Sequence, residues 1–397
     1  MLIGIVGKPS CGKSTFFKAA TLAEVDIANY PFTTIKPNHA VGFVRVDCVD
    51  TFFKVQCNPR TGFCMKGKRF VPVDLIDVAG LVPGAHKGEG MGKEFLNDLN
   101  QADALIHVVD VSGSVNEKGE PVEPLSYDPV NDVRFLEEEL DFWYLDILKK
   151  PWERFAKQIQ MEHKEPIRAI AKQFSGLGAD ENMIKELVRK SGLFEKQLAS
   201  WTDEDLMSFA SALRRATKPM IIAANKVDIP GAKDNFERLK KEFPDYIIVP
   251  CSAEAELALK EASKHEFIDY VPGSSSFEPK KEMSEKQLAA LNFLKTSILE
   301  PFGSTGVQKV LETVTFDVLK FFPVFPGGMN KLADQYGNIL PDCFLMKPGT
   351  TALDFAYKLH TDFGKNFVKA MDVRKRMPVG KDHVLNYGDV IEIMSSK

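Results

Sequence analysis

Residues 1–20 read MLIGIVGKPSCGKSTFFKAA, and this stretch decides the fold. The apolar run from Leu2 to Gly7 is typical of a buried strand that ends in a tight turn, and a helical pattern follows from Lys13 to about Ala20. Residues 7–14, where the strand passes into the helix, match the pattern G-x-x-x-x-G-K-[ST] in the strand–loop–helix context that it requires. We therefore expect a phosphate-binding loop.

The expected role of each loop residue follows from phosphate chemistry. Glycines let backbone N–H groups close around a phosphate, and the amino terminus of the helix adds a partial positive charge. Lys13 is expected to reach the β- and γ-phosphates as a catalytic residue, and the Ser14 hydroxyl to bind Mg²⁺. The residues expected to contact nucleotide here are Gly7, Lys8, Pro9, Ser10, Cys11, Gly12, Lys13, Ser14 and Thr15.

Further apolar runs indicate the rest of a sheet. They lie at residues 41–49, 70–78, 104–111, 220–224 and 246–250. Unbroken runs of Val, Ile and Leu are typical of parallel strands covered on both faces, so the expected fold class is α/β with a doubly wound sheet. The segment 58–69, NPRTGFCMKGKR, is turn-like and predicts that the strands at 41–49 and 70–78 pair as an antiparallel hairpin.

A change in composition divides the chain into domains. Residues 128–216 are charged, with apolar residues at spacings of three and four, which predicts a helical insert. Because strand-like runs resume afterwards, we expect the nucleotide-binding domain to comprise residues 1–127 and 217–312. The β-rich tail, residues 313–397, is expected to form one small further domain.

Composition limits the class of protein. The chain has 397 residues, of which 44% are hydrophobic and 27% charged, so it can form globular cores. Its net charge of -4 gives no general attraction for nucleic acid, so an RNA contact would need a local basic patch. The apolar start is too short for a signal peptide and no long apolar segment follows, so we expect a cytoplasmic protein without membrane contact.

The cysteines are expected to be reduced thiols. Six occur without a repeated C-x-x-C spacing, which argues against metal chelation. Cys57 and Cys64 could face each other across the turn-like segment, but ordinary packing is the preferred interpretation, and Cys48 does not change it.

The tetrapeptide Asn225-Lys226-Val227-Asp228 follows a strand-like run and predicts which base is bound. A carboxylate at Asp228 accepts two hydrogen bonds from N1–H and the 2-amino group of guanine, and adenine offers neither donor. Such an unpaired buried group can discriminate by ~10⁴-fold. Asn225, Lys226 and Asp228 are therefore expected to select guanine, and backbone N–H groups at Ser252 and Ala253 to contact its O6.

Two loops are expected to sense the γ-phosphate. Asp77 ends the run at 70–78, so its carboxylate is placed to hold Mg²⁺ through water, and the Gly80 N–H to detect the phosphate. Thr33 and Thr34 precede the run at 41–49, and we favour Thr34 for closing over the ion. The expected magnesium set is Ser14, Thr34 and Asp77, and the expected catalytic set is Lys13, Thr34 and Gly80.

Together these segments resemble the Obg-type GTPases, in particular their YchF branch in its archaeal-looking form. The resemblance rests on NYPFTTIKPN at 29–38, DVAGLVPGAHKGEGMGKEFL at 77–96 and NKVD at 225–228. In the tail, residues 337–372 and 385–393 resemble a TGS domain, a small β-grasp-like α+β fold. The resemblance implies a GTP-hydrolysing switch that uses Mg²⁺, with the ribosome, ribosomal RNA or tRNA as partners of the TGS domain or the helical insert.

The sequence departs from this family at three points. The main YchF branch has a non-standard base motif and prefers ATP, whereas NKVD indicates guanine, so an ATPase of the same mechanism is the first alternative. Ser10 stands where the family usually has an asparagine that helps to bind K⁺, which leaves potassium dependence open. Leu81 replaces the water-orienting glutamine of many small GTPases, which predicts slow intrinsic hydrolysis.

Two further features have alternative interpretations. His86 is either a helper in hydrolysis or a solvated loop residue. The basic residues of the tail form either an RNA or protein contact or a solvated surface; they are Lys365, Lys369, Arg374, Lys375 and Arg376. A second alternative function is a translation-associated scaffold in which nucleotide is structural.

Overall fold

The structure is a computed structural model that describes residues 1–21, 38–78 and 98–396. The chain forms two compact units, residues 1–17 with 75–254 and residues 18–74 with 255–397. Strand β4 (Lys68–Asp77) begins in the second unit and ends in the first. No helix of the described ranges combines the length and the apolar content that crossing a bilayer requires.

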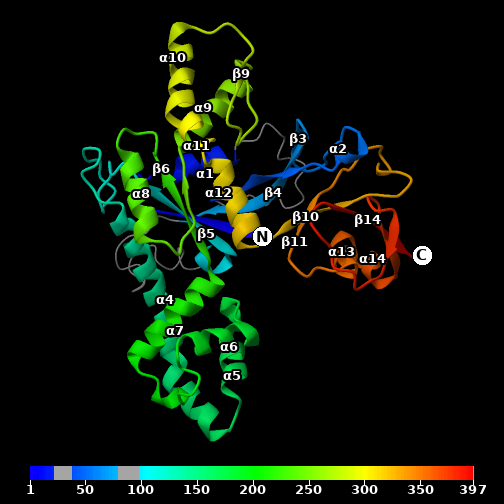
Figure 1. The fold of residues 1–397 in the computed structure, drawn as a ribbon. Coiled ribbons are helices and arrows are strands. Elements are labelled where there is room, and N and C mark those ends of the chain that lie inside the picture. The colour runs from blue at the N-terminus through cyan, green and yellow to red at the C-terminus, as the bar shows by residue number, and fades with distance from the viewer. Residues whose placement is uncertain (22–37, 79–97, 397) are drawn as a thin grey trace. The chain divides into compact units, whose positions relative to one another are not determined.

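The first unit is built on parallel strands (Figure 1). β1 (Leu2–Val6), β5 (Ala104–Asp110), β6 (Met220–Asn225) and β7 (Ile248–Pro250) lie parallel in that order, and the end of β4 adjoins β1. Every residue of β5 and β6 is buried, as expected for strands covered on both faces. Helix α1 (Lys13–Thr21) follows β1, and α8 (Ala232–Glu242) follows β6. The predicted α/β fold is confirmed.

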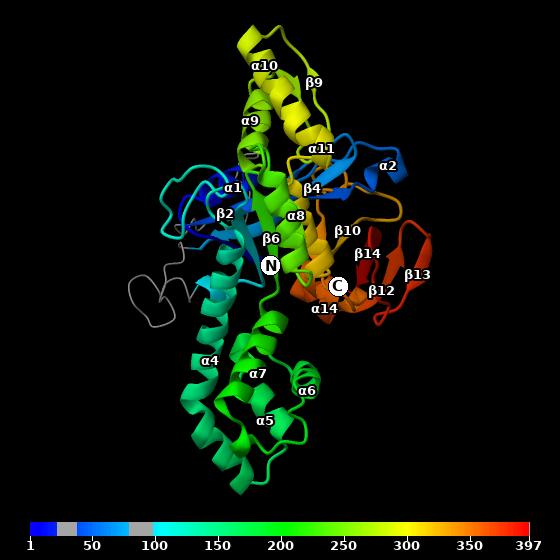
Figure 2. The ribbon, with the colours of Figure 1, turned by 60° about the vertical axis from the view of Figure 1, so that its left-hand side comes forward.

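A helical region extends from this sheet, with α4 (Val130–Met161) and α7 (Asp203–Thr217) side by side (Figure 2). α5 (Pro166–Gln173) and α6 (Glu181–Lys190) lie between them in the chain. Aromatic side chains form its core, where the Trp152 and Trp201 rings stack with centroids 4.9 Å apart. The helical character of this segment is confirmed, while the limits 128 and 216 stay predictions.

The second unit begins with β2 (His39–Asp47), α2 (Asp50–Phe53) and β3 (Phe63–Met65). β2 is the neighbour of β4 in the sheet, so the predicted pairing of these two strands is present. The tight hairpin, however, belongs to β3, which pairs antiparallel with β4 from Phe63 opposite Phe70 to Met65 opposite Lys68. The sequence pattern alone predicts a turn where this three-residue strand lies.

Residues 253–318, which precede the strands of the tail, are mainly helical. The helices are α9 (Ala253–Lys264), α10 (Glu285–Leu294), α11 (Glu300–Phe302) and α12 (Val307–Glu312), with π-helical turns at Lys295–Leu299 and Thr313–Val318. A small antiparallel pair, β8 (Ile268–Asp269) with β9 (Glu278–Pro279), separates α9 from α10.

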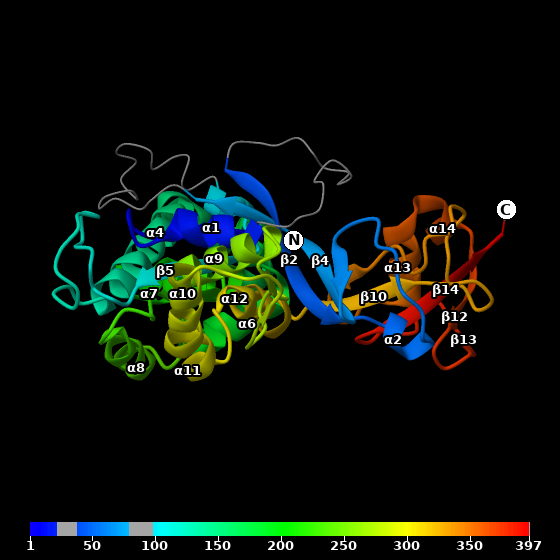
Figure 3. The ribbon, with the colours of Figure 1, turned by 90° about the horizontal axis from the view of Figure 1, so that it is seen from above.

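The tail forms its own mixed sheet (Figure 3). The strand order is β11 (Phe344–Met346), β10 (Phe322–Pro326), β14 (Asp389–Ser395), β12 (Phe367–Asp372) and β13 (Met377–Val379). Only the β10–β14 pair among these strands is parallel. α13 (Ala352–Leu359) buries Phe355 against this sheet, and α14 (Thr361–Lys365) follows. The expected α+β tail is confirmed.

Candidate nucleotide-binding site

The loop between β1 and α1 has the backbone that a phosphate-binding loop needs. Gly12 has φ +93°, and a Cβ there would lie 2.3 Å from Asn225 Nδ2. At Gly7 a Cβ would lie 2.7 Å from the Val108 carbonyl oxygen. α1 starts at this loop, since the Phe16 N–H donates to the Gly12 carbonyl at 2.8 Å. Only glycine fits at both positions, because any side chain would collide with neighbouring atoms.

Lys13 and Asp77 come together at the end of the loop. The Lys13 ammonium forms an ion pair with Asp77 Oδ1, although the two residues are 64 positions apart in the chain. Ser14 is exposed on the first turn of α1. A hydroxyl and a carboxylate are the hard oxygen ligands that Mg²⁺ prefers, so Ser14 and Asp77 fit the predicted ion.

The side chains of Lys8 and Ser10 do not point into the loop. Lys8 is buried, with Nζ 2.9 Å from Asp132 Oδ2, 2.7 Å from the Val115 carbonyl and 3.8 Å from the Tyr127 ring centre. Ser10 has φ +62°, and its hydroxyl donates to the Gly119 carbonyl at 2.9 Å. Any contribution of these two residues to phosphate binding must therefore come from their backbone N–H groups.

Asn225 links the segment that is predicted to contact the base to the predicted phosphate loop. It ends β6 and is 2% exposed. Its Nδ2 donates to the Cys11 carbonyl at 3.0 Å, and its Oδ1 accepts from the Ala253 N–H at 3.0 Å. One buried amide thus joins three segments that are far apart in sequence, and it fixes their spacing.

Lys226 is held by residues that sequence analysis missed. Its φ is +62°, and its ammonium donates to Asp110 Oδ2 at 2.8 Å and to Ser114 Oγ at 3.3 Å. It also reaches the Ser10 carbonyl at 3.3 Å. Asp110 is fully buried at the end of β5, one strand from Asn225. The only pattern that could have indicated it is a polar residue at the carboxyl end of a buried strand.

Asp228 lies half-buried just beyond this network. The Val227 N–H donates to the Cys251 carbonyl at 3.2 Å, which holds the turn against the segment after β7. In the part of the chain that the structure describes, no side chain or backbone donor pairs with the Asp228 carboxylate. The Ala253 N–H, by contrast, is already bonded to Asn225, so a contact from it to guanine O6 would have to share that hydrogen bond.

Family models match this chain in three places. A model described as 50S ribosome-binding GTPase matches residues 2–133. A model described as Obg-like GTPase YGR210-like, G4 motif-containing domain, matches residues 223–327, which include the Asn225–Asp228 turn. The TGS domain model matches residues 335–395.

Whole-chain similarity decides the family. A GTP-binding protein of Methanocaldococcus jannaschii is 47% identical over 396 residues, which cover 100% of this chain and 99% of that protein. A crystal structure of a GTP-binding protein from Pyrococcus horikoshii is 40% identical and covers 100% of both chains, with a TM-score of 0.76. The chain belongs to the Obg-like GTPases of the YchF branch. A Haemophilus influenzae relative of this Obg-like GTPase, named ribosome-binding ATPase YchF, is 25% identical over 98% of this chain and 97% of its own.

Part of the predicted site of this Obg-like GTPase lies outside the described residues. This applies to Thr33, Thr34 and Gly80, and to Leu81 and His86. Their predicted roles in binding Mg²⁺ and in hydrolysis stay predictions.

The basic residues of the TGS domain do not form one uniform cluster. Arg374 donates to the Gly388 carbonyl at 2.9 Å, and Lys375 pairs with Asp372 at 2.8 Å. Lys365, Lys369 and Arg376 are exposed. Two of the five basic groups therefore already have partners within their own domain.

Proposed function

We propose that this Obg-like GTPase hydrolyses GTP slowly to GDP and phosphate and acts as a nucleotide-dependent switch in ribosome- or translation-linked processes in the cytoplasm. The Asn225 bridge supports this most strongly. By joining the Cys11 carbonyl to the Ala253 N–H, it sets the distance between the phosphate loop and the base-reading turn. Asp228 then presents a carboxylate that suits the N1–H and 2-amino donors of guanine.

The catalytic groups act by position and charge. Lys13 exchanges its Asp77 partner for the β- and γ-phosphates when nucleotide binds, and it stabilises the charge that develops as water attacks in line. Ser14, Asp77 and Thr34 are the residues that would hold Mg²⁺, and the bound ion would supply neutralisation of phosphate charge. Leu81 offers no group to orient the attacking water, which accounts for slow turnover.

The same contacts supply the switch. Asp77 is paired with Lys13 and would be released to the ion when Lys13 turns to phosphate, which couples the segment starting at Asp77 to the nucleotide state. Gly80 follows three residues later and would sense the γ-phosphate. In this proposal the helical insert, residues 128–216, and the TGS tail, residues 313–397, transmit that state to a ribosomal or RNA partner.

Two other functions compete with this proposal. An ATPase of the same mechanism is favoured by the name of the Haemophilus influenzae relative. A scaffold in which nucleotide is only structural is favoured by the TGS domain, because the domain has a core of its own. A comparison of GTP and ATP binding distinguishes the proposed GTPase from an ATPase. A comparison of partner binding in different nucleotide states distinguishes the proposed switch from a scaffold.

Single-turnover and multiple-turnover assays with Mg²⁺ test the proposed chemistry. We expect release of phosphate from GTP with repeated turnover, and loss of that activity in Lys13→Ala. Lys18→Ala, an exposed lysine on the same helix, is the matched control and should keep the wild-type rate. Equal phosphate release by Lys13→Ala would contradict the assigned role.

Co-sedimentation with ribosomes tests the switch. We expect the amount bound to differ between a non-hydrolysable GTP analogue and GDP, and this difference to vanish in Lys13→Ala. Equal binding in both nucleotide states, with Lys13→Ala folded and binding equally, would favour the scaffold instead.

A further inference from the structure

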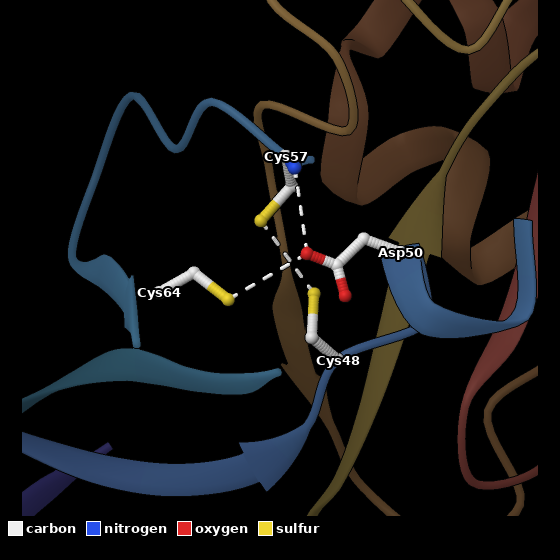
Figure 4. Close-up of side chains that lie close together, drawn as sticks. All are labelled: Cys48, Asp50, Cys57 and Cys64. Carbon is white, nitrogen blue, oxygen red and sulfur yellow. Dashed lines mark hydrogen bonds between the residues drawn. The ribbon is translucent and has the colours of Figure 1, made fainter. Parts of the chain in front are cut away.

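Four metal-ligating side chains that the nucleotide site does not use meet in the second unit (Figure 4). Cys48 follows β2, Asp50 begins α2, Cys57 lies in the next loop and Cys64 lies on β3. One donor atom from each lies within 4.8 Å of all the others. The spacing of these cysteines lacks a repeated C-x-x-C pair, so the sequence pattern alone favours ordinary packing over metal binding.

Two of the separations between donor atoms match edges of a tetrahedral zinc site. Cys48 Sγ and Cys57 Sγ are 3.6 Å apart, and Cys64 Sγ and Asp50 Oδ2 are 3.7 Å apart. In a tetrahedral zinc site the metal–ligand lengths place two sulfurs about 3.8 Å apart, and a sulfur and an oxygen about 3.6 Å apart. These two separations fit a tetrahedral ion, and all four donor atoms lie within 4.8 Å of one another.

Burial and charge favour a cation at this point. Cys48, Asp50 and Cys57 are 2%, 3% and 3% exposed, and Asp50 Oδ1 has no hydrogen-bond partner among the residues that the structure describes. A buried carboxylate oxygen without a partner is unfavourable unless a cation or donor satisfies it. The other oxygen, Oδ2, accepts from the Cys57 N–H at 3.4 Å, which aims the carboxylate at the thiols.

Arg69 supplies the balancing charge around the cluster. It is 1% exposed and lies opposite Cys64 in the antiparallel β3–β4 pair. Within residues 1–21, 38–78 and 98–396 its Nε has no hydrogen-bond partner, while its two terminal nitrogens donate to the Leu340 and Pro341 carbonyls. A divalent ion held by three thiolates and a carboxylate is net negative, so a buried cation beside it is favourable.

We propose that Cys48, Asp50, Cys57 and Cys64 bind one structural Zn²⁺ ion. Thiolate ligands select zinc among the common divalent ions, and four protein ligands leave no open position for substrate. The thiols that coordinate lose their protons to solvent, and no oxidation occurs.

The ion would fix the loop that contacts the TGS segment 339–342. The Asn58 N–H donates to the Ile339 carbonyl at 2.8 Å, and the Arg60 N–H donates to the Pro341 carbonyl at 3.0 Å. Both donors lie between the ligands Cys57 and Cys64. Removing zinc should therefore loosen these two hydrogen bonds without changing the base preference of the nucleotide site.

Metal analysis of the full-length protein, purified under reducing conditions with zinc in the medium, tests the proposal. Native mass spectrometry should show one zinc ion per chain. Cys64→Ala should lose it and Cys64→His should retain it, because Cys64 is the least buried of the three thiols and histidine is also a zinc ligand. Cys343→Ala, at a buried cysteine outside the cluster, is the control and should keep full occupancy.

Two measurements on the wild-type chain avoid dependence on the folding of variants. Cobalt should give the ligand-field absorption of a tetrahedral site with thiolate charge transfer, and zinc should displace it. Zinc removal by a chelator should increase hydrogen exchange at the Asn58 and Arg60 amides. The proposal is overturned if folded wild-type protein binds neither ion, if Cys64→Ala keeps its zinc, or if thiol counting shows a Cys48–Cys57 disulfide.

Discussion

At the scale of single residues, the site depends on close approaches that only particular side chains permit. Gly12 and Asn225 illustrate this. Because Gly12 has no side chain, the Asn225 amide can approach and hydrogen-bond to the Cys11 carbonyl of the phosphate loop. Backbone conformation and packing therefore impose the same requirement on position 12.

Gly12→Ala tests this requirement. The substitution places a Cβ 2.3 Å from Asn225 Nδ2 at φ +93°, so we expect at least a tenfold loss of GTP affinity, about 1.4 kcal/mol, by isothermal titration. Gly178→Ala is the matched control, with φ +84° and nothing within 4 Å of its Cβ. It should lose about 1 kcal/mol of stability and keep its affinity. Equal affinities for both variants would refute the steric argument.

Local sequence patterns predict the candidate site residues that lie close to one another along the chain. The phosphate loop and the NKVD turn are each one continuous segment, so a local pattern is enough to find them. Their buried contacts with other segments are seen only in the structure. The Lys226–Asp110 and Asn225–Cys11 contacts could not be predicted, because they depend on the register of β5 against β6 and on β1 lying beside β5. The cysteine cluster was missed for the same reason, since the fold rather than a repeat brings its members together.

At the scale of elements, one buried arginine connects the helical region to the sheet unit. Arg214 on α7 is 1% exposed and donates to Asp141 Oδ1 on α4 at 2.8 Å and to the Tyr246 hydroxyl at 3.1 Å. It also lies 3.3 Å from Glu137 Oε1. The amphipathic pattern predicted the helices correctly, but it could not show that a charged residue, Arg214, is buried where α7 packs against α4.

Arg214→Ala should destabilise the protein by about 3–5 kcal/mol, because it leaves the largely buried Asp141 carboxylate without its cationic partner. Its neighbour Arg215 also lies 3.3 Å from Glu137 Oε1 but is 54% exposed, so Arg215→Ala should cost no more than about 1 kcal/mol. Urea denaturation of both variants, compared by midpoint at constant slope, measures the difference. Similar losses would show that burial does not govern this network.

The start of α13 predicts a pH-dependent contribution to stability. Thr351 Oγ1 accepts from the Asp354 N–H at 3.2 Å, and Asp354 Oδ2 accepts from the Thr351 N–H at 2.8 Å and from its hydroxyl. These bonds, the backbone N–H first, lower the pKa of Asp354 below its ordinary 3.8. The stabilisation is therefore complete above about pH 4 and is lost as the pH falls through the lower, folded-state pKa.

Thr351→Ala should consequently lower stability by about 1 kcal/mol at neutral pH, and the gap from wild type should narrow in acid. Thermal melting at several pH values measures this gap. Thr361→Ala is the control, since His360 rather than Thr361 caps α14. A gap that stays constant down to pH 2 would exclude Asp354 as its source.

At the scale of the whole molecule, neither compact unit is one continuous stretch of the chain, because each combines two separate segments. β4 belongs to both units, so the limits of the nucleotide-binding domain cannot be placed from the sequence pattern alone. The tail is simpler, because its sheet and its core come from one continuous segment. The sequence pattern therefore predicts the TGS fold, but not the grouping of residues 18–74 with residues 255–397.

A fragment of residues 320–397 should fold alone with a cooperative thermal transition, because it contains the complete core of β10–β14 and α13. It should melt below the full-length protein, since it lacks the Arg69 and Asn58 donors to residues 339–341. Circular dichroism measures both properties. A fragment without a cooperative transition would show that this core is insufficient.

The most direct test of the central claim is base selectivity at Asp228. Purified protein with Mg²⁺ is titrated with GTP, ATP and xanthosine triphosphate, beside Asp228→Asn and the control Asp234→Asn, an exposed carboxylate on α8. We predict that wild type and the control bind GTP far better than ATP, and that Asp228→Asn loses GTP and gains xanthosine triphosphate. Wild-type binding of ATP as tight as or tighter than that of GTP would contradict the account.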